Sequence, residues 1–250
     1  MLKRKKSYHW ADVPNFGDRL APLLLERFAG IKAKWSPIGK AEIVTVGSVL
    51  EHIPPLWDGW ILGSGKLYED SRLHLHTNTA TILALRGPLS AGQCPPGSYA
   101  IGDPGLLAPD LLDSREPEKF WDLGLVPHWS DDGLARDSRF VNSGWNTRLI
   151  TPSQDPMTVI REISQCHKIV TSSLHGMILA DSFGIPRRFE PVKEWESSQG
   201  GMFKFQDYLK SIGAPLITGK LTSVSRLHVE DRKNELYDAY EELGRQVRSR

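Results

Sequence analysis

Short apolar runs that alternate with segments of helical periodicity constrain the fold of this chain more than any other feature. Runs of this kind, bordered by glycine and turn residues, are typical of strands buried on both faces of a parallel sheet. The first helix is expected at residues 18–29, where leucine and phenylalanine recur at helical spacing. The expected strands of this first series lie at residues 42–49, 59–62, 81–85 and 98–102.

A second series follows the polar, proline-containing stretch at residues 109–118. Asp155 and Pro156 predict a helix start, because aspartate caps helices and proline fits their first turn. Gly184 and the nearby Pro186 predict the end of a later helix. The expected strands lie at residues 123–128, 147–151, 168–171 and 187–191, and the expected helices at 155–166, 172–183, 202–212 and 229–247.

Two successive series of strands and helices predict an α/β protein with two doubly wound, Rossmann-like sheets. We expect a first domain at residues 1–112, a second at residues 113–228 and a C-terminal helix at residues 229–250. Ligands of such sheets bind outside the carboxyl ends of the strands. The cleft between the two domains is therefore the expected site.

Charge and composition argue against several classes of protein. The formal net charge of +1 is not that of a dedicated nucleic-acid binder. The two cysteines, Cys94 and Cys166, have neither metal-ligand nor disulfide spacing, so we expect no metal site. The sequence predicts a cytoplasmic protein, because it shows no signal peptide and no apolar stretch of about 18 residues. The basic run at residues 3–6 is expected to be a solvated tail, with contact to anionic lipid as the alternative.

The segment Thr171-Ser172-Ser173-Leu174-His175-Gly176, between an expected strand and an expected helix, combines several features of an anion site. Ser172 or Ser173 can cap the helix, and the free N–H groups of its first turn favour a negative ligand. His175 lies in that first turn, where the helix dipole lowers the pKa of an imidazole. A histidine beside an anion site suits acid–base chemistry, although a packed structural histidine is the alternative.

Other polar residues follow the expected strands. Arg86 comes after the strand at 81–85 and is suited to bidentate contact with a carboxylate or phosphate. Gly63 and Ser64 begin a loop in which a ligand can approach the backbone closely, although its spacing is not that of a Walker A loop. For each of these residues a capped turn or a packed side chain is the structural alternative. Further candidates for the cleft are Asn15, Asp18 (also a candidate helix cap), Asp103 and His128.

Taken together, these segments resemble the polysaccharide pyruvyltransferase family. They follow the family's order over about residues 8–210, and Ser-Ser-Leu-His-Gly before a helix and Gly-Ile-Pro is the most specific of them. The remaining segments are Asn15-Phe16-Gly17-Asp18, Gly63-Ser64-Gly65, Leu85-Arg86-Gly87-Pro88, Ile101-Gly102-Asp103-Pro104, Pro127-His128 and Phe203-Lys204-Phe205 with Asp207-Tyr208. The resemblance implies a GT-B-like fold without metal or cofactor, whose C-terminal helix crosses back to the first domain. It also implies phosphoenolpyruvate as donor and a cyclic pyruvate ketal on a sugar as product.

Under this resemblance, Arg86 and His175 are the expected catalytic residues. The donor is expected to contact Arg86, Ser172, Ser173, Leu174, His175, Lys204, Gly63 and Ser64. The acceptor is expected to contact Asn15, Asp18, Asp103 and His128. Whether the acceptor is lipid-linked, and whether the protein touches the inner face of the plasma membrane, stay open at this point.

Two other functions are compatible with the same sequence. A GT-B glycosyltransferase that uses a nucleotide sugar would share the fold, with Glu190 as a candidate ribose ligand. A glycan-binding partner without catalytic activity is the second alternative. Arg86 and His175 disfavour the second alternative, because a binding module needs no group for proton transfer.

Overall fold

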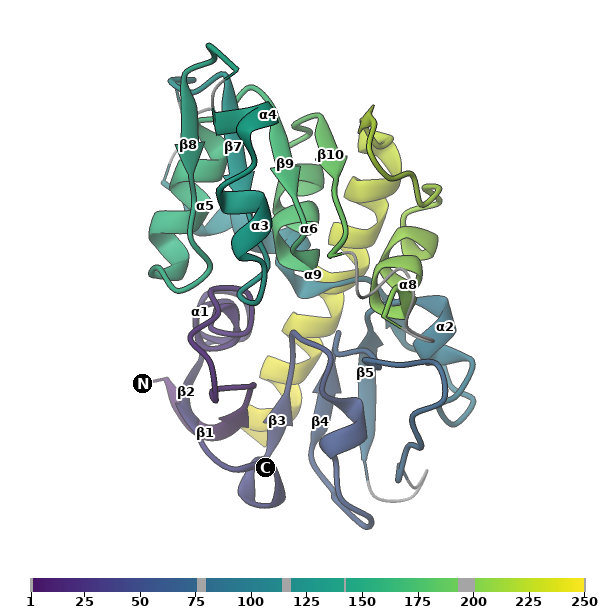
Figure 1. Ribbon diagram of the computed structural model, residues 1–250. Helices are drawn as coiled ribbons and strands as arrows, with labels where there is room; N and C mark the ends of the chain where they lie inside the picture. Colours follow the sequence, from purple (N-terminus) through teal and green to yellow (C-terminus); the bar gives the residue numbers. More distant parts are fainter. Residues whose placement is uncertain (1, 76–79, 114–117, 142, 193–200, 250) are drawn as a thin grey trace.

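The computed structural model describes residues 2–75, 80–113, 118–141, 143–192 and 201–249. It is an α/β structure with two sheets, one above the other in Figure 1. The first sheet has the strand order β2-β1-β3-β4-β5-β6, and all of its pairs are parallel. Its strands are β1 (Lys3–Tyr8), β2 (Ile31–Trp35), β3 (Ile43–Val44), β4 (Trp60–Leu62), β5 (Thr81–Leu85) and β6 (Ala100–Ile101).

The second sheet has the order β11-β10-β9-β7-β8 and is parallel except for the edge pair β10–β11. The strands β7 and β9 are buried along their whole length, which explains their largely apolar sequences. The strands of this sheet are β7 (Leu123–Val126), β8 (Thr147–Leu149), β9 (Ile169–Thr171), β10 (Arg187–Phe189) and β11 (Leu221–Thr222).

The longer helices begin and end where the capping residues predict. Asp155 accepts hydrogen bonds from the backbone N–H groups of Met157 and Thr158 and so caps α5. Gly184, which follows α6, adopts a left-handed φ of 66°. The helices of the second half are α3 (Asp132–Ala135), α4 (Ser138–Val141), α5 (Pro156–Ser164), α6 (Leu174–Ser182), α8 (Phe203–Ser211) and α9 (Arg226–Ser249).

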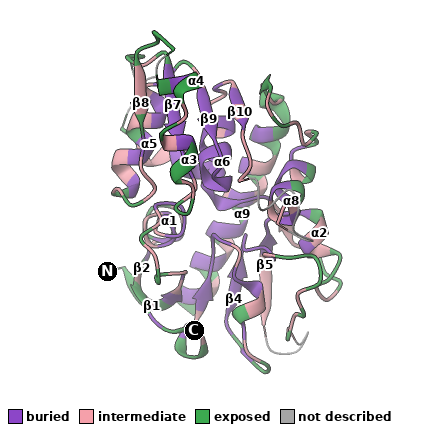
Figure 2. Ribbon diagram, viewed as in Figure 1, coloured by how far each residue is buried: buried purple, intermediate pink, exposed green. Residues whose placement is uncertain are grey.

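In the first half, α1 (Leu20–Leu24) continues directly into the π-helical turn η1 (Leu25–Ala29). The remaining helical segments here are η2 (Ile38–Lys40), η3 (Leu50–His52), α2 (Pro88–Ala91) and the 3₁₀ segment η4 (Pro104–Leu111). Figure 2 shows α6 and α9 as largely buried, and η4 packs against both of these helices while η1 packs against α9. One apolar core therefore extends across both halves.

The C-terminal helix α9 runs from the second half back along the first sheet (Figure 1). It packs against η1, η4, β4, β5 and β6, all of which belong to the first half. Trp60 of β4 donates from Nε1 to Oε1 of Gln246 at 2.7 Å, close to the end of this helix. The helix thus ties the two sheets together.

Three expectations from the sequence are corrected. The basic run at residues 3–6 is not a solvated tail: it belongs to β1, which lies between β2 and β3. Strand β2 was not expected, because lysines interrupt its apolar pattern. The expected strand at 42–49 is only β3, since Gly47 adopts a φ of 106° and turns the chain into a loop.

Candidate functional site

A cavity of about 390 Å³ lies between the two sheets, at the carboxyl ends of their strands. Each sheet has a topological switch point, where the connections from two adjacent strands run to opposite sides of the sheet. The two strands are β1 and β3 in the first sheet and β7 and β9 in the second. The cavity lies where the loops after these four strands meet, as expected for α/β sheets. It is lined by Trp10, Val13, Asn15, Asp18, Ser48, Val49, Leu67, Tyr68, His128, Trp129, Ser130, Ser173, Leu174, His175, Gly201 and Lys204.

The start of helix α6 forms one wall. Ser173 is its N-cap, and its Oγ accepts a hydrogen bond from the N–H of Gly176 at 3.3 Å. The N–H groups of the first turn have no partner within the helix, so this wall favours an anion. Ser172 is fully buried behind the wall, where its Oγ donates to Asp131 and accepts from the N–H of His128 at 2.9 Å. Ser173 and Leu174 line the cavity, whereas Ser172 joins the loops after β7 and β9.

His175 occupies the deep part of this wall. Its side chain is only 6% exposed, and Nε2 has no hydrogen-bond partner among the described residues. Burial lowers its pKa to about 3, and the positive charges of Lys204 and Arg86 act in the same direction. The imidazole is therefore uncharged at neutral pH in the empty cavity. The expected direction of the shift is confirmed, and desolvation is its largest cause.

The loop after β1 packs directly against this histidine. A Cβ atom on Gly17 would lie 2.0 Å from Nδ1 of His175, so only glycine fits at this position without displacement. Phe16 packs edge-on against the same imidazole, with ring centroids 6.2 Å apart. The Asn-Phe-Gly-Asp and Ser-Leu-His segments are thus two sides of one contact between the halves.

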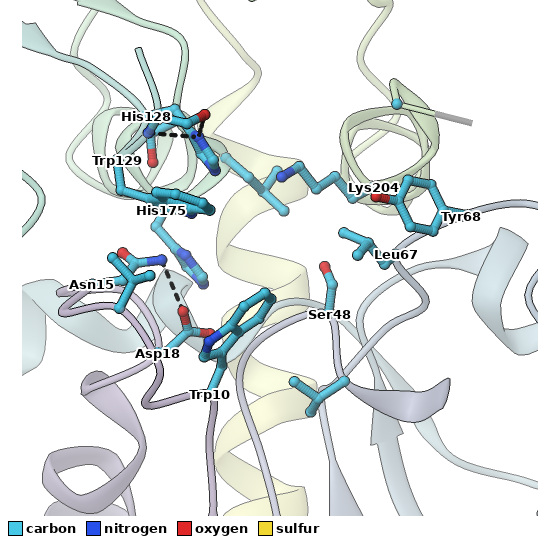
Figure 3. Close-up of a pocket in the computed structure, with 16 residues that line it drawn as sticks. Trp10, Asn15, Asp18, Ser48, Leu67, Tyr68, His128, Trp129, His175 and Lys204 are labelled. Carbon is cyan, nitrogen blue, oxygen red and sulfur yellow. Dashed lines mark hydrogen bonds between the residues drawn. The ribbon is translucent and has the colours of Figure 1, made fainter. Parts of the chain in front are cut away.

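Asp18 faces the cavity from the first half. Asn15 donates from Nδ2 to its Oδ2 at 2.8 Å, as Figure 3 shows. Burial raises the pKa of Asp18 to about 7, although Lys204 and Asn15 both act to lower it. The expectation that Asp18 caps the first helix is wrong, because Arg19 holds the N-cap position and makes no side-chain cap bond.

Lys204 and His128 complete the ionisable lining (Figure 3). Burial lowers the pKa of Lys204 to about 8, with Arg86 lowering it further and Asp18 raising it. Burial also lowers the pKa of His128 to about 3. Its Nδ1 lies 2.8 Å from Oγ of Ser130. At neutral pH the cavity thus holds one lysine cation, one carboxyl group near its midpoint and two uncharged imidazoles.

Arg86 lies behind the cavity wall and is not among its described lining residues. The side chain is fully buried and donates from Nε to Oδ2 of Asp207 at 3.0 Å. It also donates to Oγ of Ser48, which does line the cavity. The positive charge of Arg86 therefore lies close to the cavity, but its guanidinium group is not among the groups that line it.

Gly63, Ser64 and Asp103 also lie outside the described lining. Gly63 has a φ of 90°, and a Cβ there would lie 2.3 Å from the Pro104 ring. Ser64 donates from Oγ to the carbonyl of Gly47 at 2.8 Å. Asp103 caps η4 by accepting from the N–H of Gly105. The structure gives these three residues local structural contacts and does not bring them to the cavity.

Sequence reasoning missed much of the first-half lining. Trp10 and Ser48 lie in the loops after β1 and β3. The sequence pattern does not predict β1, and it predicts a strand that continues to residue 49, so neither loop is expected from the sequence. Tyr68 lies three residues beyond the glycine loop that was singled out. Within the described residues, no group of three or more histidine, cysteine or acidic side chains is arranged to hold a metal ion.

The fold and the cavity define an α/β protein whose candidate ligand site lies between two sheets. Residues 66–189 match the model of a family described as polysaccharide pyruvyl transferase. The matched stretch includes Arg86, His128 and His175 but neither Asp18 nor Lys204. The chain is thus similar to this family over residues 66–189.

Two relatives extend the comparison. The chain is 29% identical over 218 residues to the succinoglycan biosynthesis protein ExoV of Rhizobium meliloti, an alignment that covers 83% of this chain and 65% of ExoV. It is 30% identical over 166 residues to an uncharacterized protein of Acanthamoeba polyphaga mimivirus, covering 61% of this chain and 54% of that protein. The chain thus spans a little over half to about two thirds of the length of these relatives.

Proposed function

We propose that this protein transfers the pyruvyl group of phosphoenolpyruvate to two hydroxyls of a sugar in an exopolysaccharide or its precursor. The product is a cyclic pyruvate ketal, and phosphate is released. One observation carries the proposal: a single cavity gathers the start of α6, the Lys204 ammonium, the Asp18 carboxyl group and His175, whose Nε2 has no hydrogen-bond partner among the described residues. The match of residues 66–189 to the polysaccharide pyruvyl transferase family and the similarity to ExoV support it.

The donor site in this proposal is the second-half wall. Phosphoenolpyruvate carries a phosphate and a carboxylate on three carbons and needs several donors at short range. The N–H groups at the start of α6, next to Ser173 and Leu174, hold one anionic group, and Lys204 holds the other. Arg86 lies behind the cavity wall and donates a hydrogen bond to Ser48, which lines the cavity. We therefore assign Arg86 a positioning and electrostatic role instead of direct contact with the donor.

The reaction needs balanced proton transfers. C3 of the donor gains a proton, which makes C2 electrophilic, and one sugar hydroxyl attacks C2. The C2–O bond to phosphate then breaks, and the second hydroxyl attacks and closes the ketal. Of the two hydroxyl protons, one replaces the proton taken up by C3 and the other leaves with phosphate.

His175 is the proposed proton-transfer group, because its uncharged ring can accept a hydroxyl proton. Such a transfer contributes roughly 10²–10⁴-fold. Asp18 and Asn15 are proposed to hold the acceptor hydroxyls from the first half, with His128 beside them. Gly63, Ser64, Ser172 and Asp103 support these loops from behind. The reaction as proposed uses no metal or cofactor.

Two features support a GT-B-like arrangement as part of the proposal. The carboxyl ends of both sheets face one cavity, and α9 returns to the first sheet. We further propose that the acceptor is lipid-linked and that the protein works at the inner face of the plasma membrane. No helix in the described parts of the chain is long and apolar enough to cross a membrane.

One exposed face of the first sheet supports peripheral contact with a membrane. Arg4 pairs with Lys32 and Lys6 with Lys34 across β1 and β2, so the four cations share this face. All four are exposed, and none forms a salt bridge within the described residues. Like charges directly opposite across strands are destabilising, which an anionic surface would relieve.

The test is incubation with phosphoenolpyruvate and a panel of β-mannosides, galactosides and glucosides. We expect phosphate release coupled to a pyruvyl adduct detected by mass spectrometry. His175→Gln should lower turnover, and Lys204→Gln should weaken donor binding. Parallel reactions with nucleotide sugars test the glycosyltransferase alternative. Nucleotide release without any pyruvyl adduct would overturn the proposal.

A further inference from the structure

Three aromatic side chains surround the mouth of the cavity. Trp129 is 44% exposed and Tyr68 is 45% exposed, yet both line the cavity, and the half-buried Trp10 lines it next to Asp18 (Figure 3). They come from the loops after β7, β4 and β1, and so from both halves. Exposed aromatic rings that border a cavity are typical of ligand sites.

The cavity is graded from a polar floor to an aromatic rim. Asp18 and His175 are 8% and 6% exposed, whereas Lys204 and His128 are half-buried between this floor and the mouth. The rim is apolar on its ring faces and carries no charge. A ligand that spans this gradient must present an apolar face at the mouth and polar groups toward the floor.

Trp129 is held in place. Its ring lies against that of His128, with centroids 5.2 Å apart and planes inclined by 40°. The His128 ring is itself fixed through Nδ1 by Oγ of Ser130 at 2.8 Å. A supported indole that keeps nearly half of its surface exposed is a preformed platform, because little side-chain freedom is lost when a ligand stacks on it.

We propose that this aromatic rim, formed by Trp10, Tyr68 and Trp129, is the binding site for one neutral pyranose ring of the acceptor. This inference rests on the proposed function and assigns the acceptor a place within it. A pyranose has an apolar C–H face that stacks on an aromatic ring, and its hydroxyls project from the edge. With Trp129 as the main platform, a pair of hydroxyls is directed toward Asp18 and Asn15.

The charges of the lining favour a neutral sugar over a nucleotide. Among the described lining residues, Lys204 is the only lysine or arginine, and Asp18 supplies a carboxyl group. The proposed donor already brings a phosphate and a carboxylate to that single lysine. A nucleotide base would also stack on the rim, but its diphosphate would add further negative charge beside Asp18.

Trp145 provides a matched control for Trp129. It is 48% exposed, belongs to the same half and does not line the cavity. We expect Trp129→Ala to raise the KM for the acceptor about tenfold, because the sugar loses the ring on which its C–H face stacks. Trp129→Phe should retain most of the affinity, and Trp145→Ala should match wild type. The Kd for phosphoenolpyruvate should be unchanged in all three.

A binding experiment separates this inference from the proposed function. Saturation-transfer NMR with methyl β-galactoside, methyl β-glucoside and methyl β-mannoside reports sugar binding without turnover. We expect a signal for at least one glycoside with wild type and Trp145→Ala, and its loss with Trp129→Ala or Tyr68→Ala. If the signals depend on Trp129 but no pyruvyl adduct forms, the sugar site stands and the proposed reaction fails. Equal signals from wild type and Trp129→Ala, or signals from uridine monophosphate alone, would overturn the inference.

Discussion

The carboxylate of Asp207 pairs with the guanidinium of Arg86 at 3.0 Å, and both side chains are fully buried between the two halves of the molecule. The same carboxylate accepts hydrogen bonds from the N–H groups of Leu89 and Ser90 and from Oγ of Ser90. One side chain of α8 thus holds the end of β5 and the start of α2. The pair fixes the second half against the first and keeps the charge of Arg86 behind the cavity.

Removing Asp207 should therefore destabilise the whole molecule. We expect Asp207→Ala to lower the free energy of unfolding by about 3–5 kcal/mol, because it leaves a buried guanidinium without its partner. Urea denaturation at neutral pH measures this change. Arg139→Ala, which breaks an exposed pair with Asp137, is the control and should cost no more than about 1 kcal/mol. Similar losses in the two variants would contradict the assignment.

The Arg86 pair also shows where sequence reasoning reached its limit. The sequence placed Arg86 at a strand end near the cleft, and the structure has it there. Its partner lies 121 positions further along the chain, and no local pattern marks such a contact. The strand-loop-helix unit that ends in His175 was predictable, because β9, the Ser173 cap and α6 are specified by neighbouring residues.

The error at β1 has a physical origin in the exposure of the strand. Most residues of β1 are basic and exposed or half-buried, so the strand has no apolar pattern. Its sequence is therefore typical of a solvated tail. Missing β1 hid the loop that brings Trp10 to the cavity. The raised pKa of Asp18 was equally unpredictable, because it depends on burial by residues from several loops.

Gly17 should be required for the geometry of the site more than for stability. The Cβ of Gly17→Ala would lie 2.0 Å from Nδ1 of His175, so the imidazole or the loop must move. We expect turnover to fall at least about tenfold, since small misplacements of reacting groups have large effects on rate. The measurement is pyruvyl transfer together with thermal unfolding.

The control for Gly17 is Gly39→Ala. A Cβ at Gly39 would meet nothing within 4 Å, so this exposed glycine tests the general effect of adding a methyl group. Wild-type turnover in Gly17→Ala would show that the contact between Gly17 and His175 does not position the ring.

Asp18 should make stability fall as the pH rises. Its pKa is about 7 in the folded protein and near 3.8 when unfolded, so between these values the folded state holds a proton that the unfolded state has released. Deprotonation therefore favours unfolding over this interval, by up to about 4 kcal/mol at pH 8. Asp18→Asn lacks the titration, and its stability relative to wild type should rise from pH 4 to pH 8.

Urea denaturation of wild type and Asp18→Asn across this interval measures the difference directly. The buried histidines titrate in both proteins: their lowered pKa values make stability fall below about pH 6.5, and this contribution cancels in the comparison. A difference between the two proteins that does not change with pH would show that Asp18 is not a buried, proton-holding group.

The cationic face of β1 and β2 should attract an anionic membrane. Its four residues oppose one another in register, and each cation near such a surface contributes about 1 kcal/mol. Replacing all four with glutamine should weaken binding to phosphatidylglycerol-containing vesicles by about 100-fold or more at low salt, with little loss of stability because repulsion is relieved. The changes are Arg4→Gln, Lys6→Gln, Lys32→Gln and Lys34→Gln.

The loss of any four positive charges also weakens attraction to an anionic membrane. The vesicle co-sedimentation experiment therefore needs a control variant with the same net charge as the first variant. Four exposed cations on other elements supply it: Arg161→Gln, Lys210→Gln, Lys220→Gln and Arg245→Gln. Both variants change the formal net charge from +1 to −3. If the face itself binds the membrane, only the first variant detaches, and added salt weakens wild-type binding through screening. Equal losses in both variants would show that net charge, and not this face of the sheet, governs the interaction.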